Sequence, residues 1–115
     1  MSSRGSDLKS EVVSLGQSEY FIVFEGSPEN YRAVENPIKW AGAEAGVEAA
    51  REIRKLDVDI LVTGSIGPRT YDLLRDSGIS IKAGCSGTVA DSIRKCVAGE
   101  LPECKGATFA GYIGI

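Results

Sequence analysis

The sequence contains no histidine among its 115 residues. Histidine is the usual general base near neutral pH and the commonest metal ligand, so other groups must fill both roles. Cysteine is scarce as well: Cys85, Cys96 and Cys104 form no C-x-x-C pair, the usual spacing of a preformed zinc or iron-sulfur site. Because their number is odd and no export signal precedes them, we expect reduced thiols rather than disulfides.

Long apolar runs and clusters of positive charge are missing too. No apolar stretch approaches the ~20 residues that span a bilayer, and the opening MSSRGSDLKSEV lacks the apolar core of an export signal. We therefore expect a cytoplasmic protein without a membrane partner. The net charge is −3 and the lysines and arginines are scattered, so we expect no nucleic-acid partner either.

What the sequence does have is the length and patterning of one α/β domain. We expect a single domain over residues 1–115, with a polar lead at 1–18 and an apolar tail at 102–115. Residues 20–25 and 31–35 predict a β-hairpin around the five-residue loop GSPEN, ended by Pro37. From Trp40 to Leu56, apolar residues recur every three or four positions and predict a helix of about 15 residues.

Two strand-turn-helix units follow the predicted helix. The first has a strand at 59–64 and a helix opened by Pro68 and closed by Gly78. The second has a strand at 79–84 and a helix that Thr88 opens and Gly99 closes. The order predicts a parallel pairing of these strands beside the antiparallel hairpin, hence a mixed sheet of about five strands flanked by three helices.

The first candidate site is the loop GSIGPR at 64–69, between a parallel strand and a helix. Backbone N–H groups and the helix dipole favour an anion there, and ligands often bind at that edge of a sheet. Its spacing matches neither common nucleotide-binding motif, since no G-x-G-x-x-G and no lysine is present. Two interpretations stay open: Gly64, Ser65, Gly67 and Arg69 bind a ligand, or the glycines only permit a turn and Arg69 is solvated.

The second candidate site is the equivalent loop at 83–88, which we expect beside the first. It offers the thiol of Cys85, the hydroxyls of Ser86 and Thr88, and the flexible Gly87. A cysteine at a helix N-terminus can have a lowered pKa, which suits a nucleophile or a soft-metal ligand. Without a histidine partner the nucleophile is the weaker interpretation, and a half-buried structural residue is the alternative. We expect Cys96 to pack in the core, while the role of Cys104 is open.

Collinear segments over residues 5–101 resemble one family, the dinitrogenase iron-molybdenum cofactor biosynthesis family of the NifX type. The segments that carry the resemblance are DLKSEV, EYFIVFE, VENP, VDILVTGSIGPRTYDLLRDSGISI, G-x-x-G-T-V and AGEL. The resemblance implies a ribonuclease H-like fold without catalytic carboxylates. It also implies a non-catalytic carrier of an anionic iron-molybdenum-sulfur or iron-sulfur cluster, or its precursor, for an acceptor metalloenzyme, as a monomer or homodimer. The matching positions include Gly64, Gly67 and Arg69 in the first loop and Gly87 and Thr88 in the second.

Two departures from the family pattern shape the hypothesis. The histidines expected before the YF strand and after NP are absent, which leaves Cys85 as the expected metal ligand. The alternative is an interaction or regulatory module that has lost the cluster. We also expect the first, central strand of the family to be missing from this chain. An open edge there should be filled, and the tail segment TFAGYIGI, in its own chain or exchanged with a second, competes with EVVSL for the slot.

Overall fold

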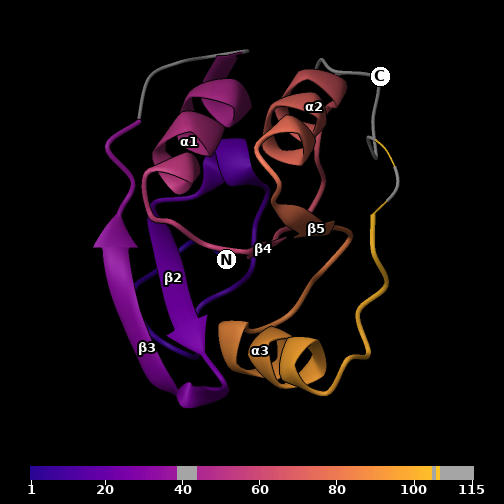
Figure 1. The fold of residues 1–115 in the computed structure, drawn as a ribbon. Helices are drawn as coiled ribbons and strands as arrows, with labels where there is room; N and C mark the ends of the chain where they lie inside the picture. Colours follow the sequence, from indigo (N-terminus) through magenta and orange to yellow (C-terminus); the bar gives the residue numbers. More distant parts are fainter. Residues whose placement is uncertain (39–43, 105, 107–115) are drawn as a thin grey trace.

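The computed structural model describes residues 1–38, 44–104 and 106, and its strands form two sheets (Figure 1). β1 (Ser2–Ser3), β2 (Tyr20–Glu25) and β3 (Ser27–Glu35) are antiparallel, in the order β1-β2-β3. β4 (Ile60–Val62) and β5 (Ser80–Lys82) form a separate parallel pair. The predicted mixture of antiparallel and parallel strands is confirmed. The predicted single sheet is wrong for the described residues, because none of their strands pairs with both β2 and β4.

In the described part of the chain, three α-helices cover the strands from two sides. α1 (Ala45–Arg54) and α2 (Pro68–Asp76) pack side by side on one face, and α3 (Val89–Val97) lies on the other (Figure 1). A short 3₁₀ helix, η1 (Leu15–Gln17), packs against α1. The architecture is therefore a helix-sheet-helix sandwich of mixed α/β class.

The core consists of two clusters, one on each side of the strands. Phe21 and Leu61 point into the cluster under α1 and α2, while Ile22 and Val62 point into the cluster over α3. This alternation follows from the two-residue period of a strand. Phe21 and Ile22 of β2, and Leu61 and Val62 of β4, are thus buried on opposite faces of their strands.

The helix boundaries agree with their sequence signals. Val47, Ala50 and Ile53 of α1 are buried as the periodicity predicts, and residues 40 and 43 of that predicted helix lie outside the described residues. Pro68 occupies the first turn of α2. At its end, Gly78 has φ +80° and the N–H of Ile79 donates to the carbonyl of Leu74 at 3.1 Å.

The predicted five-residue hairpin loop is wrong. Residues 27–30 belong to β3, and Gly26, at φ +76°, makes the reversal with a bulge between Phe24 and Glu25. The sequence predicts a turn at Pro28, which instead lies in β3. This proline is compatible with β3 because this is an edge strand, where a missing N–H leaves no ladder bond unmade.

The first 18 residues, expected as a polar lead, contribute to the core. Ser2 and Ser3 are fully buried beside β2, and Val12 and Val13 are each 7% exposed. The chain doubles back on itself, with Ser3 bridging Val12 in antiparallel fashion. EVVSL therefore lies between β1 and the end of β4, because the N–H of Val13 donates to the carbonyl of Ser2 at 3.2 Å and the carbonyl of Val13 accepts the N–H of Gly64 at 3.2 Å. The competing segment TFAGYIGI lies outside the described residues.

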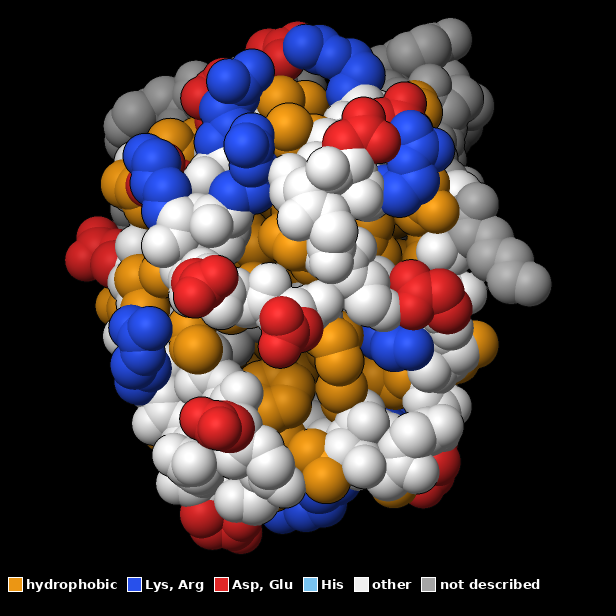
Figure 2. All heavy atoms as spheres, in the orientation of Figure 1, with side chains coloured by type: hydrophobic (Ala, Val, Ile, Leu, Met, Phe, Trp, Pro, Cys, Tyr) orange, Lys and Arg blue, Asp and Glu red, His pale blue; other side chains and the backbone are white. Residues whose placement is uncertain are grey.

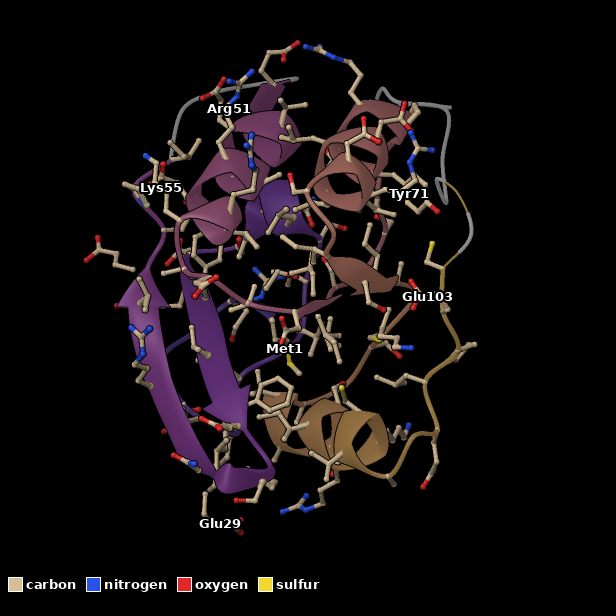
Figure 3. The ribbon with its side chains drawn as sticks, viewed as in Figure 1. Met1, Glu29, Arg51, Lys55, Tyr71 and Glu103 are labelled. Carbon is tan, nitrogen blue, oxygen red and sulfur yellow. The ribbon has the colours of Figure 1, made fainter. Side chains whose placement is uncertain are left out.

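The α-ammonium of Met1 is buried beside β2. Its N–H donates to the carbonyl of Ile22 at 2.9 Å, and Met1 is labelled at the centre of the molecule in Figure 3. Burial lowers the pKa of this ammonium from 8.0 to about 5, with a smaller opposing effect from Cys96.

This burial predicts a pH-dependent stability for the 115-residue chain. Between pH 5 and pH 8 the unfolded chain holds a proton that the folded chain has released, so stability rises with pH, by up to about 4 kcal/mol. No histidine titrates in this window. Urea unfolding at four pH values measures the slope. Acetylation of the N-terminus should abolish the slope, whereas an equally flat profile in the unacetylated chain would contradict this account.

Candidate functional site

The two candidate loops lie directly beside each other. The N–H of Gly84 donates to the carbonyl of Gly64 at 2.7 Å, and the N–H of Cys85 donates to that of Thr63 at 3.1 Å. Both loops follow the carboxyl ends of the parallel strands β4 and β5, the edge where α/β sheets usually bind ligands. The expected adjacency is therefore confirmed.

A third segment, residues 10–14, completes this edge. The N–H of Val12 donates to the carbonyl of Gly87 at 2.9 Å, and the N–H of Gly64 donates to the carbonyl of Val13 at 3.2 Å. The hydroxyl of Ser14 lies 2.6 Å from that of Ser65 and accepts the N–H of Ser65 at 3.2 Å. We call segment 10–14 and loops 63–69 and 83–88 together the rim.

Sequence reasoning missed the part that Ser14 plays. A serine after two valines carries no spacing signal that would place it against a loop about 50 residues later in the chain. The only hint was EVVSL itself, a short apolar run inside an otherwise polar stretch.

In the first loop, the glycines are buried and the polar side chains are exposed. Gly64 and Gly67 are both buried, whereas Ser65 and Arg69 face solvent. A Cβ on Gly64 would lie 3.1 Å from the backbone nitrogen of Ser14, so this glycine permits the close approach of segment 10–14. Gly64 thus shapes the rim, and Ser65 and Arg69 are the groups that a ligand would meet.

Arg69 already has a partner. Its guanidinium forms a short ion pair with the carboxylate of Glu44, at the start of α1, and both side chains are largely exposed. An exposed pair of this kind contributes little to stability and is screened by salt. An anion at the rim would compete with Glu44 for the guanidinium.

The N-terminus of α3 is not the open donor site that its position suggests. The N–H groups of Val89 and Ala90 donate to the carbonyls of Ser10 and Leu8, at 2.8 and 2.9 Å. The hydroxyl of Thr88 accepts the N–H of Asp91 at 3.2 Å, which confirms the predicted cap but occupies that hydroxyl. The N–H groups of Val89, Ala90 and Asp91 are therefore already bonded and are not free for a ligand.

The second loop therefore presents a smaller set of groups. Ser86 and Gly87 are exposed, and Gly87 has φ +86°, a conformation that other residues rarely adopt. At α2 the first turn is more open, since within the described residues no carbonyl from another segment caps it. The exposed groups of the rim are thus Ser86, Gly87, the side chain of Arg69 and Ser65, whose N–H and hydroxyl are already bonded to Ser14.

The thiol of Cys85 lies half-buried in the second loop. It points toward the carbonyl of Lys82, at 3.7 Å from sulfur to oxygen. Burial, together with the nearby Cys96, raises the pKa of this thiol above its ordinary value, and the charge of Lys95 opposes the shift. The expected lowering of the pKa by the helix N-terminus is therefore wrong, because burial outweighs it.

The other two cysteines belong to neither loop of the rim, although Cys96 is close enough to Cys85 to affect the pKa of its thiol. Cys96 is on α3, packed against the cluster that contains Ile22 and Val62. Burial raises the pKa of its thiol. Cys104 packs near α2, where the hydroxyl of Tyr71 donates to its carbonyl at 3.3 Å. Within the described part of the chain, no group of three or more Cys, Asp or Glu side chains has the geometry of a metal site.

The described α-helices are nine or ten residues long. None of them has both the length and the apolar character that a bilayer crossing requires.

Comparisons with solved structures identify the fold. The apo form of the orange protein from Desulfovibrio gigas superimposes with a TM-score of 0.86 at 23% identity, over 94% of this chain and 92% of that one. A Thermotoga protein, TM1290, described as a NifB-type protein of the DUF35 family, gives 0.74 at 26% identity, over 95% and 94% of the two chains. PH0822 gives 0.72 at 24% identity, over 91% and 94%.

Sequence comparison identifies the family. No curated protein matches the chain significantly. The family model described as dinitrogenase iron-molybdenum cofactor, however, matches residues 2–99. Because this match covers both candidate loops and most of the sequence, the chain belongs to the dinitrogenase iron-molybdenum cofactor family.

Proposed function

We propose that this protein binds an anionic metal-sulfur cluster, or a precursor of one, at the rim and carries it without turnover. The observation that supports this most is the hydrogen-bonded joining of the two loops at Gly84 and Gly64, which gathers the exposed donors at one edge. Family membership links the chain to an iron-molybdenum cofactor. The cluster is cargo in this proposal, with an acceptor metalloenzyme as the partner and the cytoplasm as the location.

The rim suits an anion held mainly by hydrogen bonds. Ser86 and Gly87 bring hydroxyl and N–H groups to the surface, and Ser65 adds a hydroxyl that it shares with Ser14. The start of α2 adds the positive end of a helix dipole. Arg69 supplies a positive charge once Glu44 releases it. Such donors fit the sulfide surface of a preformed cluster and require no set of protein ligands to build one.

Cys85 is the one thiol in this part of the rim, and we propose it as the direct metal ligand. A metal binds the thiolate, so binding must release the proton that burial keeps on the thiol at neutral pH. The expected consequence is a cargo that is held weakly through sulfur and can be passed on.

A second function, an interaction module that has lost its cargo, has specific support. α3 is capped by segment 8–10, Arg69 is paired with Glu44, and the thiol of Cys85 is held protonated. Each of these reduces the attraction of the rim for an anion. The two functions differ in whether the purified chain retains a metal-sulfur anion.

Anaerobic incubation with tetrathiomolybdate and ferrous iron tests the carrier function. Molybdenum and iron should coelute with the protein in gel filtration, as measured by metal analysis and visible absorption. Ser86→Asp should weaken retention on the order of five- to tenfold, because a carboxylate near an anion costs roughly 1 kcal/mol or more. Ser77→Asp, an equally exposed change at the far end of α2, is the matched control. Absence of retained metal in the unmodified chain would favour the interaction module.

Cys85→Ser tests the proposed metal bond. In the unmodified chain, retention should increase between about pH 7 and pH 9, because the thiolate population grows toward its raised pKa. In Cys85→Ser this increase should disappear. Cys96→Ser, at a second thiol whose pKa burial raises, should keep it. Identical retention and pH dependence in Cys85→Ser and the unmodified chain would exclude Cys85 as a ligand.

A further inference from the structure

The rim contains a single positive charge. Its ionised side chains at neutral pH are Arg69 and Glu11, because burial keeps the proton on the thiol of Cys85. The carboxylate of Glu11 lies 3.7 Å from the guanidinium of Arg4, so this pair adds no net charge. The chain as a whole carries a charge of −3, and Figure 2 shows acidic and basic side chains distributed over the same face of the molecule. The Coulomb attraction of the rim for an anion therefore depends on Arg69.

The guanidinium of Arg69 is occupied by a carboxylate from the neighbouring helix. It forms a short ion pair with Glu44, the N-cap residue of α1. The two side chains are 67% and 47% exposed, so anions in solution have access to both. Glu44 thus takes the place on the guanidinium that an incoming anion would need.

Close packing fixes the start of α1, and with it Glu44, beside Arg69. A Cβ on Gly46 would lie 2.9 Å from the hydroxyl oxygen of Thr70, the residue after Arg69. A Cβ on Gly16, in η1, would lie 3.0 Å from the backbone nitrogen of Gly46. α1 therefore contacts both α2 and η1 at this end. A carboxylate tethered so close to the guanidinium has an effective concentration there on the order of millimolar or more.

We propose that Glu44 is an intramolecular competitor for Arg69, which weakens anion binding at the rim and returns to the guanidinium when the cargo leaves. This inference rests on the proposed function, because it concerns the affinity of the same rim. The competition lowers the affinity for each anion by a common factor, since every anion must first displace the same carboxylate.

This competition gives the rim a charge threshold. A monoanion such as chloride only replaces one negative charge by another, and it has no tether to offset the entropy that it loses on binding. A dianion with several acceptor atoms attracts the guanidinium more strongly, and it also accepts hydrogen bonds from groups such as Ser86 and Gly87. Displacement of Glu44 is feasible for such an anion because an exposed ion pair is weak. The rim is thereby reserved for multiply charged anions.

Glu44→Gln tests the competition, with tetrathiomolybdate as the dianionic probe in anaerobic calorimetric titration. At low ionic strength the variant should bind the probe about five- to tenfold more tightly than the unmodified chain, because glutamine leaves the guanidinium free. In about 0.5 M salt the gain should fall below about twofold. Glu48→Gln is the matched control: this side chain of α1 is 44% exposed and pairs with Arg51 of the same helix. Its affinity should change less than about twofold.

A double-mutant cycle shows whether Glu44 acts through Arg69. In an Arg69→Gln background, Glu44→Gln should give no gain in affinity, because the carboxylate then has no guanidinium to occupy. An equal gain in both backgrounds would overturn the proposal, since Glu44 would then act only as a nearby negative charge. Urea unfolding should be unchanged in each variant, because the exposed pair contributes little to stability, and this verifies that all of them fold.

The titrations also separate this proposal from the carrier function. Binding by the unmodified chain with no gain in Glu44→Gln would overturn the competition and leave the carrier function standing. Binding by Glu44→Gln alone would support the competition and count against carriage by the unmodified chain. Absence of binding in both would contradict both proposals.

Discussion

The backbone carbonyl of Val13 connects the two sheets by hydrogen bonds. It accepts hydrogen bonds from the hydroxyl of Ser2 at 2.5 Å and from the N–H of Gly64 at 3.2 Å. The hydroxyl of Ser2 also lies 2.7 Å from that of Thr63, at the end of β4. β2 and β4 have no direct pairing in the described residues, so this buried polar group and the two apolar clusters hold the halves together. Loss of such a buried hydrogen bond destabilises the fold, because the polar groups would be left buried without a protein or water partner.

The segment that contains Val13 also determines which hydrogen-bond donors of the rim remain free. Segment 10–14 contacts both loops, through Val13 and Gly64 in the first and through Val12 and Gly87 in the second. In the same segment, the carbonyl of Ser10 accepts the N–H of Val89 and so caps the start of α3. The fold therefore uses part of the donor set that an anion would otherwise find there. What is left is a shallow edge with hydroxyls, a few N–H groups, one paired arginine and one protonated thiol. This set is suited to holding a preformed anion reversibly, and poorly suited to assembling one.

Much of the fold could be predicted because its signals are local. Pro68, Gly78 and Thr88 mark helix ends through their own backbone preferences, and the apolar spacing of α1 reflects its contact with the core. The adjacency of the two loops followed from the parallel pairing of their strands. The hairpin loop failed because Pro28 is a turn signal that an edge strand tolerates.

The candidate site was less accessible to sequence reasoning. The capping of Ala90 by Leu8, the pairing of Arg69 with Glu44 and the contact of Ser14 with Ser65 join residues 25 to 82 positions apart. The pKa of Cys85 depends on burial, which its spacing does not report.

The central claim is that the rim receives the metal-sulfur anion. Titration of ¹⁵N-labelled protein with tetrathiomolybdate under anaerobic conditions, followed by amide NMR, measures this directly. The account predicts saturable shifts at Ser65, Ser86 and Gly87, with Ile60 and Val97, which lie outside the rim, unmoved. Shifts confined to Ile60 and Val97, or none at saturating tetrathiomolybdate, would contradict it.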